Sequence, residues 1–111
     1  MNWKKHLLTV SAGFAVLLAG LTQASAATNW ELHHPRRAEV VGRAAHQSRD
    51  INEERREGDL TGPQARRLHA EDHAIVRQEQ RFARAHDGRI TRPEQRLLNG
   101  EENAVGRHIP E

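Results

Sequence analysis

The sequence contains no cysteine and no tyrosine, and aromatic residues make up only 4% of its 111 residues. Without thiols it has no disulfide framework, no cysteine nucleophile and no attachment site for a bacterial lipid anchor. A chain of this length forms at most one small domain. Both lysines lie in the first six residues, and from Ala27 onward arginines and acidic side chains are equal in number. That balance argues against a nucleic-acid-binding module, which needs an excess of positive charge.

The N-terminal segment has the pattern of an export signal. Lys4 and Lys5 precede an apolar run from Leu7 to Leu21, and Ala24-Ser25-Ala26 has the small residues of a cleavage site. The run is shorter than the roughly 20 apolar residues of a membrane-spanning helix. We therefore predict a signal peptide over residues 1–26 with cleavage near Ala26. The expected location is the periplasm or the exterior, with no membrane anchor after cleavage.

An internal repeat occupies residues 58–76 and 88–106, at a constant offset of 30 residues. Each copy opens with the residue types that end one helix and begin the next. Glycine suits the left-handed end of a helix, threonine the N-cap and proline the first turn, and Gln or Glu completes a capping box. The predicted structural caps are Gly58, Thr61, Gln64, Gly88, Thr91 and Glu94.

Between these corners, apolar residues recur at three- and four-residue steps, and no segment alternates with the two-residue period of a strand. The sequence predicts an all-α protein with three antiparallel amphipathic helices at about 35–57, 61–87 and 91–109, joined by tight corners. A flexible segment is expected at 27–34. Large apolar side chains are few, so we expect a thin core and marginal stability.

The three- and four-residue steps also assign one face of each predicted helix to the core. The first helix presents Ala38, Val41, Ala45 and Ile51. The second presents Ala65, Leu68, Asp72, Ile75, Glu79 and Phe82, and the third presents Leu97, Leu98, Glu101, Ala104, Val105 and His108.

Histidines are the first candidates for a metal site. His69 and His73 lie four residues apart on the second predicted helix, so both rings could reach one zinc ion. The competing interpretation is a polar flank beside the apolar face. The residue order argues against a zinc-protease helix, because glutamate occupies neither customary position between the two histidines. The histidines that could complete a site are His33, His34, His46, His86 and His108.

A second candidate is calcium, because Asp87 to Glu94 resembles the latter half of an EF-hand loop. The opening half lacks ligands, since Ala83 and Ala85 stand where the first two ligating side chains belong. The earlier copy closes on Gln64 in place of a glutamate. The sequence therefore argues against calcium, and a degenerate EF-hand-like protein is the third functional interpretation.

The sequence has no recognisable catalytic set. Neither Ser48 nor any threonine lies in a nucleophile elbow, and a core this lean encloses no dry pocket for acid–base chemistry. The acid pairs Glu71-Asp72 and Glu101-Glu102 are interpreted as solvated faces and interhelical salt links. We expect a protein that is not an enzyme.

The two corner phrases, Leu60-Thr61-Gly62-Pro63-Gln64 and Ile90-Thr91-Arg92-Pro93-Glu94, resemble the signature of the LTXXQ-motif periplasmic proteins, the Spy and CpxP group. The resemblance covers these corners and implies envelope-stress proteins that form helical dimers and hold partly unfolded clients without ATP. Some members of the group bind zinc or other metals.

The leading hypothesis is therefore a small exported, non-enzymatic helical binding protein, an envelope-stress chaperone or accessory factor. Its expected partners are other proteins or unfolded clients. A homodimer is a separate prediction, because pairing would double the buried apolar surface of a lean core. The alternative is a periplasmic zinc-binding or zinc-sensing protein that uses His69 and His73, and otherwise no cofactor is expected.

Overall fold

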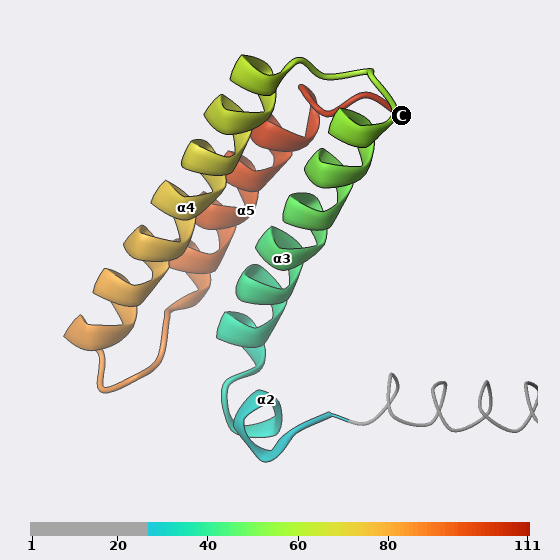
Figure 1. Cartoon of the computed structure of the whole chain (residues 1–111). Coiled ribbons are helices and arrows are strands. Elements are labelled where there is room, and N and C mark those ends of the chain that lie inside the picture. The colour runs from blue at the N-terminus through green and yellow to red at the C-terminus, as the bar shows by residue number, and fades with distance from the viewer. Residues whose placement is uncertain (1–26) are drawn as a thin grey trace, which may run out of the picture.

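The computed structural model describes residues 27–111, and the predicted signal peptide lies outside them. Within this range the helices are α2 (Asn29–His33), α3 (Pro35–Arg56), α4 (Gly62–Ala85) and α5 (Arg92–Gly106). No strand occurs in the described residues, so the all-α fold class is confirmed. None of these helices combines the length and apolar character that a bilayer span requires. The three long helices lie side by side, and α2 lies at the N-terminal end of α3 (Figure 1).

Residues 27–34, which the sequence analysis expects to be flexible, contain the short helix α2. Thr28 Oγ1 accepts a hydrogen bond from the Glu31 backbone N–H at 3.1 Å, and the Glu31 carboxylate accepts from the Thr28 N–H at 2.7 Å. The Trp30 ring stacks on His34 with ring centroids 4.9 Å apart, and the Arg37 guanidinium lies 5.3 Å from the Trp30 ring centroid. Five residues are too few for a periodic apolar pattern, so the periodicity that predicts the long helices gives no signal for α2.

The two corners between the long helices are built alike. Thr61 accepts from the Gln64 N–H at 3.2 Å, and the Gln64 side chain accepts from the Thr61 N–H at 2.8 Å. Thr91 and Glu94 form the same capping box at the start of α5. Gly88 has φ +88°, in the left-handed region that strains any residue with a side chain, and the first corner has its equivalent glycine in the same conformation.

All three long helices end earlier than predicted, and α3 does so by a single residue, at Arg56. α4 ends at Ala85, where 87 is predicted, and Asp87 adopts a φ of +56° beyond it. α5 ends at Gly106, where 109 is predicted, because His108 and Ile109 donate to carbonyls three residues earlier and form turns. Helix boundaries are poorly defined by an apolar pattern, since the last turn buries little.

The core lies between α3, α4 and α5. α3 buries Val40, Ala44, Gln47 and Ile51. The face predicted for this helix is therefore wrong except at Ile51: Ala38 and Val41 are half-buried and Ala45 is exposed. The reason is that the buried stripe includes a glutamine, which a search for apolar residues assigns to the surface.

The other two long helices bury acids among their apolar residues. α4 buries Ala65, Leu68, Asp72, Ile75, Glu79 and Ala83, while Phe82 is only half-buried. α5 buries Leu98, Glu102 and Val105, and Leu97 is 48% exposed. Leu60 and Ile90, the residues just before the two N-caps, complete the core from the corners.

Candidate functional site: a groove between α4 and α5 and a buried polar layer

A groove of about 420 Å³ runs along the line where α4 meets α5. Ala74 and Ala104 keep it open because their side chains are small, and Ile75 and Val105 contribute the larger apolar side chains of its floor. Its polar lining residues are Glu71, Gln78, Glu101 and His108. The Gln78 amide faces the Glu101 carboxylate, 2.7 Å away in the orientation in which its nitrogen donates.

The residues that line this groove are all repeat-related pairs. They pair at the 30-residue offset as Glu71 with Glu101, Ala74 with Ala104, Ile75 with Val105, and Gln78 with His108. α4 and α5 run in opposite directions (Figure 1), so each pair lies diagonally across the groove. Each end therefore combines an acid with an amide or an imidazole, and the groove has an approximate two-fold symmetry that the sequence repeat generates.

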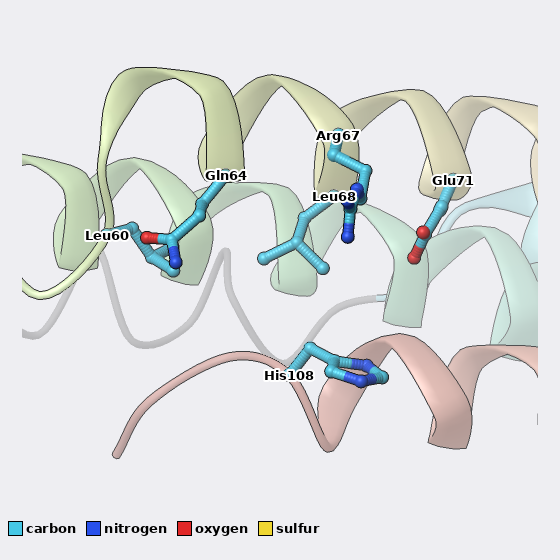
Figure 2. Close-up of a pocket in the computed structure, with 6 residues that line it drawn as sticks. All are labelled: Leu60, Gln64, Arg67, Leu68, Glu71 and His108. Atoms are coloured by element: carbon cyan, nitrogen blue, oxygen red, sulfur yellow. The ribbon is translucent and has the colours of Figure 1, made fainter.

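At the end near the α3–α4 corner the groove meets a pocket of about 150 Å³. Figure 2 shows its lining residues, Leu60, Gln64, Arg67, Leu68, Glu71 and His108, with His108 opposite the α4 side chains. The repeat partner of Arg67 is Leu97, which lies one helical turn before Glu101. One end of the groove thus has a guanidinium where the other has an exposed leucine.

In the core, each of the three long helices also buries a polar side chain: Gln47 is 6% exposed, Asp72 3% and Glu102 0%. Gln47 Nε2 donates to the backbone carbonyl of Glu102 at 2.8 Å. Gln47 Oε1 and both carboxylate oxygens of Asp72 and Glu102 have no hydrogen-bond partner within the described chain. Asp72 and Glu102 are therefore buried and do not lie on solvated faces as predicted, whereas Glu102 does have an interhelical salt link, with Arg43 of α3.

Burial determines the protonation of these acids. It raises the pKa of Glu102 to about 8, against the opposing effect of Arg43, whose Nε lies 3.9 Å from Glu102 Oε1. The negative charges of Glu39, Asp72 and Glu101 raise this pKa further. Burial is also the main cause that raises the pKa of Asp72 to about 6. Both carboxyls therefore hold their protons at a higher pH than surface acids do.

Glu79 is a buried carboxylate whose two oxygens both accept hydrogen bonds. It is 0% exposed, and Arg37 donates from Nε and Nη2 to its two oxygens at 2.5 and 3.2 Å. Arg37 Nη1 also donates to the Gly88 carbonyl at 3.4 Å. Arg43 forms no such two-pronged contact with Glu102, because its Nη2 donates to the Asn103 side chain.

Within the described residues, the structure does not bring together His69 and His73, the two histidines predicted as zinc ligands, with a third ligand. His69 Nε2 lies 2.9 Å from Asn52 Oδ1 and its Nδ1 lies 3.5 Å from Ser48 Oγ, so both ring nitrogens face α3. His73 is exposed. Among residues 27–111, neither histidine belongs to a group of three metal-ligating side chains.

Such a group does occur at the α3–α4 corner, where ligand atoms of Glu54, Glu57 and Asp59 lie within 4.8 Å of one another. The pKa of Glu54 is raised by burial and then by Asp59, and that of Glu57 by its contact with the Glu53 carboxyl. No sequence pattern predicts this cluster, because its acids come from both the end of a helix and the following loop. Acids this exposed are often close together without an ion.

Comparisons of the chain with protein-family models, with curated proteins and with solved structures give no match. Only the geometry of the site indicates what it can bind. The groove offers apolar side chains between polar rims, which suits contact with a protein segment. The polar layer holds carboxyls that can gain or lose protons.

Proposed function

We propose that this protein is a small exported, non-enzymatic helical protein that binds segments of other proteins in the groove between α4 and α5. The observation that carries the proposal is the open apolar floor formed by Ala74, Ile75, Ala104 and Val105. Exposed apolar surface with a polar rim is typical of protein-binding sites. The neutral balance of arginines and acids beyond the signal segment favours a protein partner over a nucleic acid.

The groove dimensions and chemistry favour an amphipathic segment. Two alanines let a partner backbone approach closely, and the apolar side chains of such a segment would pack on Ile75 and Val105. Arg67 and the acids Glu71 and Glu101 can form salt links with partners of different sequence. An envelope-stress chaperone or accessory factor that holds partly unfolded clients without ATP would use a surface of this kind.

An aggregation assay with an unfolding substrate protein tests the proposal. Ala74→Glu places a charge on the groove floor, and Ala45→Glu places the same charge on an exposed position of α3. Both substitutions cost little helix propensity, so both variants should remain folded. We expect Ala74→Glu to require roughly tenfold more protein for half suppression, the equivalent of about 1.4 kcal/mol of binding free energy. We expect Ala45→Glu to act like the unsubstituted protein.

The proposal fails if the unsubstituted protein does not suppress aggregation at stoichiometric amounts, or if both variants lose activity equally. Light scattering of the same proteins separates client binding from self-association. A dimer that pairs through this groove would become a monomer in Ala74→Glu and not in Ala45→Glu.

A further inference from the structure

Glu102 is a fully buried carboxyl on α5 with no hydrogen-bond partner for either oxygen within the described residues. The charged groups around it come from all three long helices: Glu39 and Arg43 of α3, Asp72 of α4 and Glu101 of α5. Arg43 is the one cation among them. Its side chain is 34% exposed, and its nearest approach to the carboxylate is 3.9 Å.

A carboxylate in this position is unstable in its ionised form. A buried charge needs a close counter-ion and hydrogen bonds to its oxygens, whereas Glu102 has one long ion-pair contact, with Arg43 at 3.9 Å, and no hydrogen bond to either oxygen from the described part of the chain. The protonated form carries no charge and fits the closed core at far lower cost. Closure of the bundle around Glu102 and protonation of Glu102 are therefore coupled.

We propose that Glu102 is a pH-dependent switch that controls the packing of α5: the protonated side chain keeps α5 against α3 and α4, and loss of the proton releases α5. This inference is independent of what binds in the groove, although release of α5 would also dismantle the groove.

The rest of the bundle explains why α5 is the helix that moves. The only buried residues of α5 other than Glu102 are Leu98 and Val105. The α3–α4 pair is held by the Arg37–Glu79 contact, in which both carboxylate oxygens accept hydrogen bonds from a guanidinium. This buried ion pair between α3 and α4 does not involve Glu102.

The direction of the pH effect follows from the raised pKa. Burial raises the pKa of Glu102 from an ordinary 4.5 to about 8, so between these values the folded chain holds a proton that the unfolded chain releases. The contribution of this group to stability is complete below pH 4.5 and is lost as the pH rises through 8. Between pH 6.5 and 7.5 it should raise the unfolding equilibrium constant about tenfold.

Urea denaturation at pH 6.5 and 7.5 tests the switch with three proteins: the unsubstituted chain, Glu102→Gln and Glu101→Gln. Glutamine mimics the protonated side chain, so Glu102→Gln should lose the tenfold difference between the two pH values. Glu101→Gln removes the adjacent half-buried acid and should retain most of it. Comparing the differences between the two pH values cancels every pH-dependent contribution that all three proteins share.

Two further measurements use the unsubstituted protein, so the test survives if Glu102→Gln does not fold. The ¹³C resonance of the Glu102 carboxyl should titrate near pH 8. Amide exchange, corrected for its intrinsic pH dependence, should accelerate in α5 before it accelerates in α3. A carboxyl that titrates near 4.5 overturns the proposal, as does an unchanged pH difference in Glu102→Gln. A titration that millimolar Mg²⁺ or Ca²⁺ shifts to lower pH while stabilising the protein also overturns it, because Glu102 would then bind a cation.

Discussion

Removing Arg37 should test the energetics of the bundle more severely than any other single polar substitution. Glu79 is fully buried, and both of its oxygens depend on Arg37, whose own side chain is 19% exposed. Arg37→Met leaves the carboxylate buried without a counter-ion, which typically costs about 3–5 kcal/mol. A domain of this size has a total unfolding free energy of roughly 4–13 kcal/mol. At the low end of that range, which the thin core favours, we expect Arg37→Met to be close to its unfolding midpoint at 37 °C.

Urea denaturation followed by far-UV circular dichroism measures this cost. The double variant Arg37→Met/Glu79→Leu removes both charges and should recover most of the lost free energy, because apolar replacement of a whole buried ion pair is often neutral. Arg56→Ala is the control, since Arg56 pairs with Glu53 on the surface, where the side chains are 68% and 50% exposed. We expect it to change stability by less than about 1 kcal/mol. The reasoning is refuted if Arg37→Met costs under about 1 kcal/mol, or if the double variant is no more stable than the single one.

Three further predictions concern the core, a cap and the second buried acid. Leu98→Ala should lower the unfolding free energy by about 2–5 kcal/mol in urea titration, and Leu97→Ala by less than about 1 kcal/mol; equal losses would contradict the assigned burial. Thr91→Ala removes the N-cap of α5 and should cost about 1 kcal/mol, seen as a lower Tm, whereas an unchanged Tm would argue against the cap. The pKa of Asp72 is raised from 3.8 to about 6, so its contribution to stability is greatest below pH 3.8 and is lost as the pH rises through 6. Asp72→Asn should therefore reduce the pH dependence of the unfolding free energy between pH 4 and 6. It should leave most of the pH dependence near pH 7, which comes from Glu102. An unaltered pH dependence below pH 6 would contradict this.

The all-helical fold could be predicted from the sequence because its signals are local. A capping box needs only the spacing from Thr61 to Gln64, and the second copy repeats the same spacing. The short α2 also begins with a capping box, at Thr28 and Glu31, but with no periodic segment to support it the sequence analysis leaves this region unstructured.

The buried polar layer could not be predicted in full, because it depends on how the helices face one another. Asp72 and Glu79 fall on the predicted stripe of α4, yet the same analysis interprets Asp72 as solvated. Gln47 and Glu102 fall outside the predicted stripes altogether. A polar residue at a core position has no distinctive sequence pattern, and only the packing of three helices shows which positions are buried.

The groove could not be predicted from the sequence either, although the residues that line it belong to the sequence repeat. The repeat relates Ala74 to Ala104 and Glu71 to Glu101, but a repeat does not fix the register in which two helices pack. That register brings the equivalent residues together along one seam.

A groove with approximate two-fold symmetry does not by itself determine the direction in which an elongated segment would bind in it. Orientation has to come from a position at which the two repeats differ, and the exchange of Arg67 for Leu97 is such a position. A guest with a carboxylate at one extremity and a bulky aliphatic group at the other would lie with the carboxylate toward Arg67. Reversing those two groups in a peptide should reverse the direction in which it binds, so a single difference between the two repeats would determine the orientation of the bound segment.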